Sequence, residues 1–230
     1  MSKLTTVLGL ATALTMSATA GALAGPNLIV NGDFSAGLSD FTSGYTVPTN
    51  PACQYGVAVY CQGPESTIFV NTDPNLDHPS WTSFGTTGSG NDSPNMLIVN
   101  GGSNPLLPVW EQSSIAVMAY ETYQFTGWVA ANYASNPALI SIGFNGVTVS
   151  PPFTVSTTPG LWQEITIDWY SGSNATLDLA LFDLNPVADG NDFSVTNLSL
   201  LQTSVPEPAS AAAFMAGLAG LLIARRRRAV

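Results

Sequence analysis

The stretch Leu177–Phe182, with the sequence LDLALF, decides the fold class of this chain. Its three leucines are two residues apart, so an extended backbone places them all on one face. Gln163–Trp169 (QEITIDW) repeats this alternation, with Ile165, Ile167 and Trp169 on one side. Neither stretch follows the 3.6-residue period of a helix. Both therefore predict β-strands.

Similar β-rich runs recur along the chain between clusters of Gly, Pro, Asn and Ser, and no sustained helical period appears between residues 25 and 204. Further strands are predicted at Glu65–Val70, Met96–Val99, Trp110–Val117, Tyr123–Ala131, Ala138–Phe144, Val147–Val149 and Phe193–Leu200. Asn145-Gly146 predicts a two-residue hairpin turn between two of them. About nine short strands in one domain predict an all-β fold, an antiparallel β-sandwich.

The first 24 residues are typical of a secretory signal peptide. Lys3 supplies a positive charge, the run from Leu4 to Ala20 is mildly apolar, and Ala22 and Ala24 give the small-x-small pattern that signal peptidase accepts. Cleavage is predicted near the Ala24–Gly25 bond, which leaves residues 25–204 as the folded domain. An ordinary buried helix is the alternative interpretation.

The C-terminal residues carry nearly all of the positive charge. Four of the five basic residues of the chain are Arg225, Arg226, Arg227 and Arg228. They follow an uncharged run from Ala209 to Ala224, which as a helix is about 24 Å long, a little less than the ~30 Å hydrocarbon core of a bilayer. This order predicts a single transmembrane helix with the arginines on the cytoplasmic side and the domain outside.

The helix is preceded by Val205-Pro206-Glu207-Pro208, whose prolines keep the backbone extended and accessible. The order Pro-Glu-Pro, apolar helix and arginine cluster resembles the PEP-CTERM sorting signal of bacterial exported proteins. The resemblance implies that an exosortase recognises residues 205–230 and processes the tail near Pro-Glu-Pro. The inner membrane would then hold the protein only transiently, before it reaches the cell surface or extracellular matrix. A plain membrane anchor is the alternative.

The domain between the two ends is acidic. The whole chain has a formal net charge of −10, all of its 15 acidic residues except Glu207 lie between residues 25 and 204, and no Lys or Arg occurs between residues 4 and 224. Without a basic patch, the domain is not expected to bind nucleic acid or anionic membrane surfaces. It also lacks any lysine nucleophile or phosphate-binding clamp.

Two cysteines, Cys53 and Cys61, lie close together in the domain. In an exported protein such a pair predicts a disulfide bond. A metal or redox site would need more ligands or a tighter spacing than this pair offers.

The order of phrases in the domain resembles the galactose-binding-like jelly roll, the fold of many carbohydrate-binding modules. The phrases are NLIVNGDFSAG at 27–37, ISIGFNGVTV at 140–149 and NDFSVTNLSL at 191–200. The resemblance implies that residues 27–34 and 193–200 are neighbours. It also implies a structural Ca²⁺ near Asp33 and Asp192, although Ser35 and Thr196-Asn197 stand where such modules often have acids. The alternative is that both carboxylates bond turn amides.

Catalytic and metal motifs are weak. His78 is the only histidine, no Gly-x-Ser-x-Gly elbow accompanies it, and zinc would need further His or Cys ligands. Asp73–Asp77 begins like a calcium loop but lacks the sixth-position glycine and the distal glutamate, so a solvated loop is expected. Converging carboxylates of a glycoside hydrolase remain an alternative.

Tryptophans are the better candidates for a binding site. Trp81, Trp128 and Trp162 lie in a polar loop or opposite the apolar face of a predicted strand, so each is a candidate platform for a sugar ring, with core packing as the alternative. We therefore expect an exported, non-catalytic envelope or matrix protein associated with exopolysaccharide or biofilm, without a cofactor other than the calcium named above. A carbohydrate-binding module for neutral glycans is the alternative, and a glycan-active hydrolase comes third.

Overall fold

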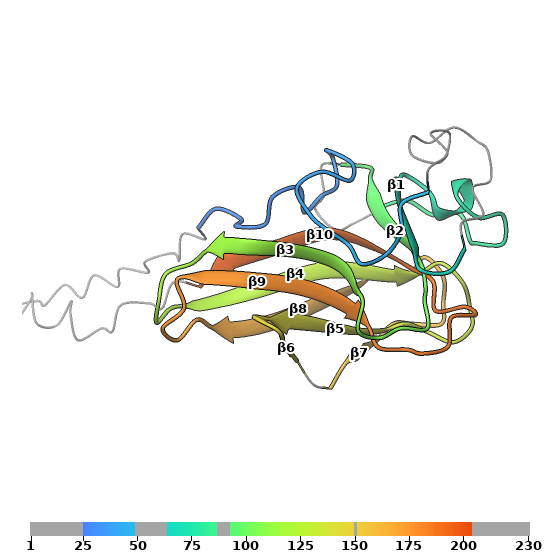
Figure 1. The fold of residues 1–230 in the computed structure, drawn as a ribbon. Coiled ribbons are helices and arrows are strands. Elements are labelled where there is room, and N and C mark those ends of the chain that lie inside the picture. Colours follow the sequence, from blue (N-terminus) through green and yellow to red (C-terminus); the bar gives the residue numbers. More distant parts are fainter. Residues whose placement is uncertain (1–24, 49–63, 87–92, 150, 204–230) are drawn as a thin grey trace, which may run out of the picture. The chain divides into compact units, whose positions relative to one another are not determined.

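A computed structural model describes residues 25–48, 64–86, 93–149 and 151–203 (Figure 1). The predictions for the signal peptide (Ala22 and Ala24), for the pair Cys53 and Cys61, and for the sorting tail (residues 205–230) lie outside these residues. Among the described residues, no helix is long and apolar enough to cross a membrane.

In the part of the chain that the structure describes, ten antiparallel strands form two sheets that face each other (Figure 1). One sheet has the order β1 (Thr67–Asn71), β2 (Met96–Asn100), β10 (Phe193–Gln202), β4 (Thr122–Ala131) and β8 (Gln163–Tyr170). The other has the order β3 (Pro108–Ala116), β9 (Thr176–Asp183), β5 (Leu139–Phe144) and β6 (Val147–Thr148), and β7 (Phe153–Thr154) also pairs with β5. The predicted all-β jelly-roll sandwich is confirmed, with one short strand more than expected.

The strands follow the alternation of the sequence. The three leucines of β9 are at most 2% exposed and contribute to the core between the sheets, whereas the residues between them face outward. β1 and β2 are apolar without alternation because both of their faces are covered. Ile68 and Leu97 belong to the main core, whereas Phe69 and Ile98 form a second, small cluster on the outer face of the five-stranded sheet.

Residues 27–34 lie beside β10, as predicted, but they do not form a regular strand. The backbone N–H of Leu28 donates to Leu200 O, and that of Leu198 donates to Gly32 O. Between these two bonds, the Asn27 side chain donates to Leu198 O and accepts from Leu200 N. A side chain thus replaces part of the backbone ladder.

The loop Asp73–Asp77 differs from the prediction of a solvated loop. Asp73 caps the short 3₁₀-helix η2 (Pro74–Leu76) by accepting from Asn75 N. This turn brings Asp77 into the protein, where it is 2% exposed and accepts a hydrogen bond from Asn71 at 3.3 Å. The sequence resembled an exposed calcium loop, but the turn buries its last carboxylate.

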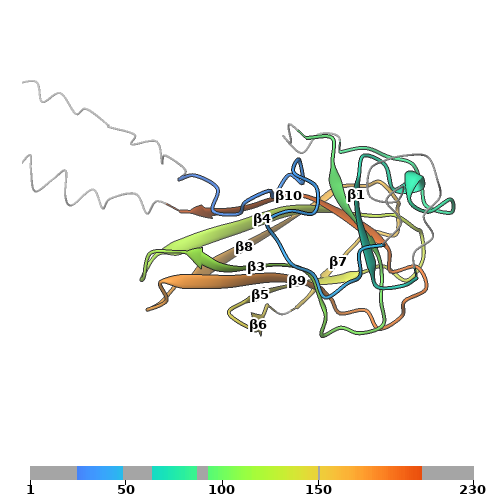
Figure 2. The same cartoon turned by 45° about the horizontal axis from the view of Figure 1, so that its top comes forward.

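The sandwich has two distinct ends (Figure 2). β10 begins after Asp192 and ends just before Thr203, so at ~3.3 Å per residue it spans about 30 Å. We call the end with Gly25, Thr203 and the loops 117–121 and 171–175 the terminal end. The opposite end, which holds the turns before β1 and β10 and the loops after β2 and β4, is the pocket end.

Candidate functional site

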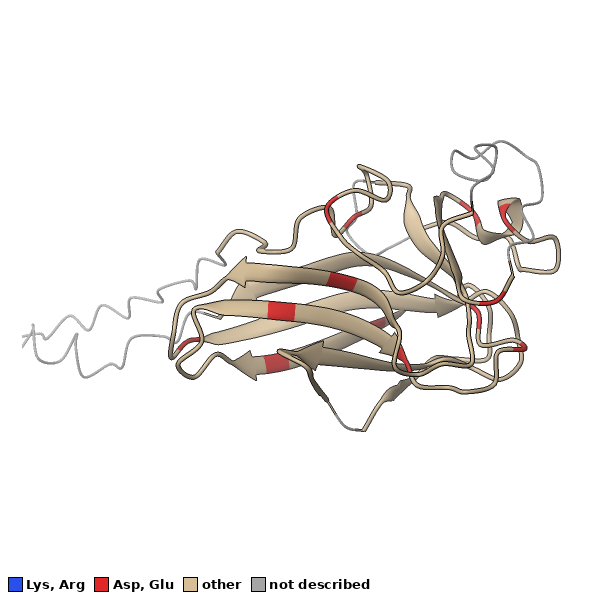
Figure 3. Cartoon of the chain, viewed as in Figure 1, with Lys and Arg blue, Asp and Glu red and all other residues tan. Residues whose placement is uncertain are grey.

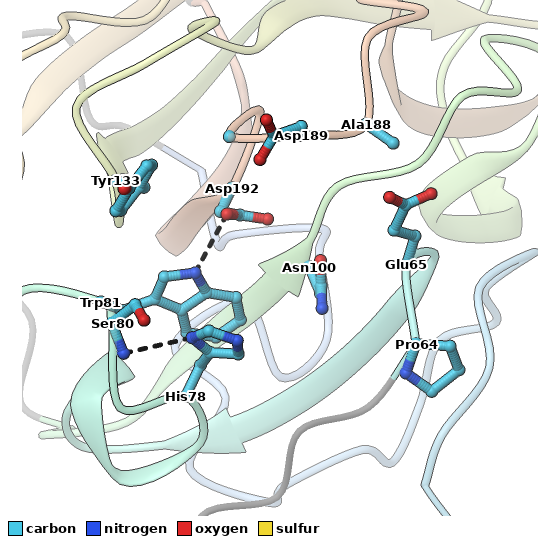
Figure 4. A pocket seen from close by; sticks show the side chains of 11 residues that line it. Pro64, Glu65, His78, Ser80, Trp81, Asn100, Tyr133, Ala188, Asp189 and Asp192 are labelled. Atoms are coloured by element: carbon cyan, nitrogen blue, oxygen red, sulfur yellow. Dashed lines mark hydrogen bonds between the residues drawn. The ribbon is translucent and has the colours of Figure 1, made fainter.

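A pocket of about 410 Å³ lies at the pocket end, and we call it the loop pocket (Figure 4). Its walls come from the turns before β1 and β10, the loop after η2, the end of β2 and the loop after β4. Strand pairing brings these segments together although they are far apart in the sequence. The lining includes the rings of His78, Trp81 and Tyr133 and the carboxylates of Glu65, Asp189 and Asp192.

Two aromatic rings in contact form part of the wall. Trp81 is 4% exposed and packs edge-on against Phe69 in the small outer cluster. The ring of His78 lies on Trp81 with centroids 4.9 Å apart. His78 Nδ1 accepts from the backbone N–H of Ser80, so the neutral ring carries its proton on Nε2. Burial lowers the pKa of His78, which keeps the ring neutral at pH 7.

Asp192 joins this wall to the sheet. Its Oδ2 accepts from Trp81 Nε1 at 3.0 Å, and its Oδ1 accepts from the backbone N–H of Gly101 at 3.0 Å. Figure 4 shows this pair between Tyr133 on one side and Glu65 on the other. At Gly101 a Cβ atom would lie 1.8 Å from Asn191 Oδ1, so only glycine allows this approach.

A second buried carboxylate, that of Asp183, stabilises the turn before β10 that holds Asn191 and Asp192. Asp183, 1% exposed, accepts at Oδ1 from the backbone N–H groups of Leu139 and Asn185. Its Oδ2 accepts from Asn191 Nδ2 at 2.7 Å. The same amide also donates to Gly102 O, next to the glycine that binds Asp192. Backbone, amide and indole N–H groups therefore hold the two carboxylates in place.

Burial without a cationic partner raises the pKa of both carboxyl groups. Burial raises the pKa of Asp192 to about 6; the hydrogen bonds from Gly101 and Trp81 lower it, and the charges of Asp189 and Glu65 raise it. Burial likewise raises the pKa of Asp183 to about 6. Above about pH 6 Asp192 therefore adds a negative charge to the loop pocket. With three carboxylates in the lining, hydrogen-bond acceptors dominate what the pocket offers to a ligand.

Asp33 and Asp192 lie far apart. Asp33 follows Gly32, whose carbonyl oxygen accepts from the Leu198 N–H, whereas Asp192 lies just before β10. At ~3.3 Å per residue, the six residues from Asp192 to Leu198 span roughly 20 Å of that strand. Asp33 Oδ1 accepts from the backbone N–H and hydroxyl of Ser35, which is the turn-amide alternative. The pair does not fit one shared calcium site, and no three acidic, His or Cys side chains converge on a metal site among the described residues. A structural calcium ion, expected near these residues by resemblance, stays a prediction.

The three candidate tryptophans lie on the same side of the five-stranded sheet. Trp81 is too buried to stack a sugar on its face, although it lines the loop pocket. Trp162 is half-buried, packs edge-on against Phe84 and donates from Nε1 to Gly85 O. Trp128 is also half-buried, on the outer face of β4 between Thr196 and Glu164. Of the three, only Trp81 reaches the loop pocket.

Sequence reasoning missed three residues of the loop pocket as ligand contacts. Tyr133, 41% exposed, and Glu65 carry no local signal, because each lies in a loop whose neighbours are set by strand register. Asp189 lies in the turn before β10, of which the sequence analysis named only Asp192. Trp81 and Asp192, assigned by sequence to a sugar platform and to a metal site respectively, form one site.

Residues 204–228 match the family described as the PEP-CTERM protein-sorting motif. The resemblance of the tail is confirmed, and the chain therefore carries the sorting motif of an exported, surface-directed protein. No curated protein matches the sequence.

The fold is similar to several solved structures. The Stig cyclase Fisc from Fischerella sp. TAU is 11% identical, with 81% of this chain and 100% of that chain covered and a TM-score of 0.51. The CBM22-1 xylan-binding domain of Paenibacillus barcinonensis Xyn10C is 13% identical over 64% of this chain and 92% of that one, with a TM-score of 0.41. The sugar-binding C-terminal domain of EclA is 18% identical over 40% of this chain and 66% of that one, with a TM-score of 0.37. At these identities the likeness extends to the fold alone.

Proposed function

We propose that this chain is a non-catalytic protein of the cell envelope or extracellular matrix that binds neutral glycans of exopolysaccharide or biofilm through the loop pocket. In this proposal signal peptidase removes residues 1–24, and the C-terminal helix holds the protein transiently in the inner membrane. An exosortase-type enzyme then processes the tail. The observation that carries the proposal is the combination of aromatic rings and hydrogen-bonding groups around one pocket of about 410 Å³.

The chemistry of the lining suits a sugar. The C–H faces of a pyranose pack on aromatic rings, and Tyr133 presents an exposed ring next to the Trp81–His78 pair. Sugar hydroxyls donate hydrogen bonds, and Glu65 and Asp189 offer exposed carboxylate acceptors. A polyanionic glycan would be repelled, because the chain has no Lys or Arg between residues 4 and 224. A neutral glycan offers C–H faces and hydroxyl donors to this lining and is not repelled by its charge.

The position of the loop pocket supports the same proposal. It lies at the end of β10 that is remote from Thr203, about 30 Å along the strand. A chain held by its C-terminal tail would therefore present the loop pocket on the far side of the sandwich from the attachment point.

The geometry of Asp192 argues against a hydrolase. A raised pKa in a pocket next to other carboxylates is the pattern of a general acid. Both oxygens of Asp192, however, accept hydrogen bonds from Trp81 and Gly101, which orient the carboxylate toward the protein. We therefore assign Asp192 to positioning Trp81 rather than to proton donation.

A glycan array followed by calorimetry on the 25–203 domain tests the proposal. Tyr133→Ala should weaken binding about tenfold or more by removing an exposed stacking ring, whereas Tyr170→Ala, a similarly exposed tyrosine at the terminal end, should leave it unchanged. Binding that is lost in Trp128→Ala and kept in Tyr133→Ala would move the site to the outer face of β4. An array without any saturable binding would reject the glycan-binding proposal and leave a purely structural matrix role.

A further inference from the structure

The terminal end of the sandwich carries an apolar surface that the proposed glycan site does not use. Met118, Tyr120 and Tyr170 are 60%, 69% and 59% exposed there. Beside them, a groove of about 310 Å³ is lined by Leu28, Met118 and other mostly apolar residues. We call Met118, Tyr120, Tyr170 and this groove the terminal surface. Exposed apolar side chains gathered in this way mark a contact surface rather than isolated surface residues.

The three exposed side chains belong to one rigid unit. The hydroxyl of Ser171, which is 0% exposed, donates to Met118 O at 2.8 Å and accepts from the backbone N–H of Glu121 at 2.9 Å. Tyr170 precedes Ser171 and pairs with Thr122 in the sheet. The backbone of the loop 117–121 is therefore fixed to the end of β8, which sets where Met118 and Tyr120 lie relative to Tyr170.

Tyr120 is held in an unusual backbone conformation. Its φ is +62°, in the left-handed region that bulky residues rarely adopt, and its N–H donates to Gly172 O. The unfavourable conformation does not bury the ring, which is 69% exposed. Strain of this kind at an exposed aromatic residue suggests that the ring contacts something other than the domain itself.

The chain itself indicates what this surface meets. The described structure ends at Thr203, and only residues 204–208 separate it from the apolar run that starts at Ala209. Five extended residues reach at most about 18 Å. Gln202 and Gly25 both line the groove, so the terminal surface is the part of the domain next to this tether.

The charges agree with this placement. In the loops 117–121 and 171–175, Glu121 is the only charged residue, whereas the other described carboxylates lie along the strands, in the loop that holds Asp33 and Asp40, or toward the pocket end (Figure 3). Tyrosine is the residue type that, with tryptophan, is enriched at membrane–water interfaces. A weakly charged surface with two exposed tyrosines and a methionine fits the interfacial region of a lipid bilayer.

We infer that the terminal surface rests on the lipid headgroup region while the tail holds the chain in the membrane, with Tyr120, Tyr170 and Met118 as the contacts. The inference rests on the membrane-held stage of the proposed function. It adds that the folded domain itself touches the bilayer. This contact would orient the loop pocket away from the membrane and would keep residues 204–208 at the bilayer surface, where a membrane enzyme can reach them.

Full chain reconstituted into phosphatidylcholine vesicles tests the inference. Tyr120→Trp and, separately, Tyr170→Trp place a reporter on the terminal surface, and Tyr133→Trp places a matched reporter at the pocket end. Bromine on the acyl chains of the lipids quenches the fluorescence of nearby tryptophans. The fluorescence that the new tryptophan contributes at position 120 or 170 should therefore be roughly twofold lower in brominated than in unbrominated vesicles, because interfacial rings lie close to the acyl chains. The emission added at position 133 should not change.

The outcomes separate the inference from the proposal on which it rests. Quenching at 120 and 170 with none at 133 supports the inference. Equal emission in both lipids at positions 120 and 170 overturns it. If the chain also fails to float with the vesicles, the membrane-held stage fails too, whereas flotation without quenching rejects only the domain contact. Quenching at all three positions would reject the inferred orientation, in which the loop pocket points away from the membrane.

Discussion

Replacing Asp77 by asparagine should stabilise the domain at alkaline pH and have little effect in mild acid. Asp77 is 2% exposed, its Oδ1 accepts from Asn71 at 3.3 Å, and its Oδ2 has no hydrogen-bond partner among the described residues. Burial raises the pKa of Asp77 to about 7; the bond from Asn71 lowers it and the charge of Asp73 raises it. Above pH 7 the folded protein therefore contains a buried carboxylate without a cation.

The magnitude follows from the pKa. In the unfolded chain Asp77 titrates near 3.8, so the folded state binds more protons between pH 4 and pH 7, and stability falls as the pH rises through this window. A difference of about three pKa units corresponds to about 4 kcal/mol above pH 7. Asparagine keeps the Oδ1 acceptor but leaves a buried N–H₂ group, which costs about 1–3 kcal/mol. Asp77→Asn should thus gain about 2 kcal/mol at pH 8 and about nothing at pH 5.

Urea unfolding at pH 5 and pH 8, followed by tryptophan fluorescence, measures both values on the 25–203 domain, which contains both apolar clusters. Asp168→Asn, on the exposed outer face of β8, is the control and should change stability by less than about 0.5 kcal/mol at either pH. The variant should keep part of the pH dependence, because Asp183 and Asp192 also have a raised pKa. A loss of stability in Asp77→Asn that is the same at both pH values would refute the reasoning, since it would mean that the Asp77 carboxylate is already satisfied.

Three further predictions concern other parts of the chain. Gly101→Ala should destabilise the domain by about 3 kcal/mol or more and abolish glycan binding, because the new Cβ would meet Asn191 Oδ1 at 1.8 Å; unfolding and array data on one sample check both effects. Tyr120→Asn should raise stability by about 0.5–1 kcal/mol in urea unfolding, since asparagine tolerates a φ of +62° better than tyrosine does, and a loss of stability would contradict this. Intact mass of the envelope form should lack Arg225–Arg228, and a mass that includes them would exclude processing.

The strands were predictable because burial on one face leaves a period of two in the sequence. The alternation in Gln163–Trp169 places Ile165 in the core, and Asn145-Gly146 adopts the two positive φ angles of a two-residue hairpin turn, +50° and +77°. β7 was missed because Phe153–Thr154 is too short to show a period. Residues 27–34 were placed beside β10 by resemblance, but their irregular pairing depends on one side chain, that of Asn27, and no periodicity encodes it.

The loop pocket could be predicted only in part, because its shape depends on which strands are neighbours. Trp81 and Asp192 were each marked by residue type, but their hydrogen bond joins positions 111 residues apart. Tyr133 enters the same pocket because β4 pairs with β10, and Glu65 enters because β1 pairs with β2. A single sequence shows candidate residues, whereas the pairing order of the sheet decides which of them meet.

The absence of Lys and Arg from the domain sequence changes how its buried acids are held. With no cation available, Asp183 and Asp192 take all of their hydrogen bonds from backbone N–H groups, an asparagine amide and an indole. Such neutral donors stabilise a carboxylate less than an ion pair does, so burial dominates and both pKa values rise to about 6. Because Asp192 also positions Trp81, its ionisation links fold stability to the geometry of the loop pocket. Mild acid should therefore increase the stability of the folded domain in the same pH range in which the loop pocket loses negative charge.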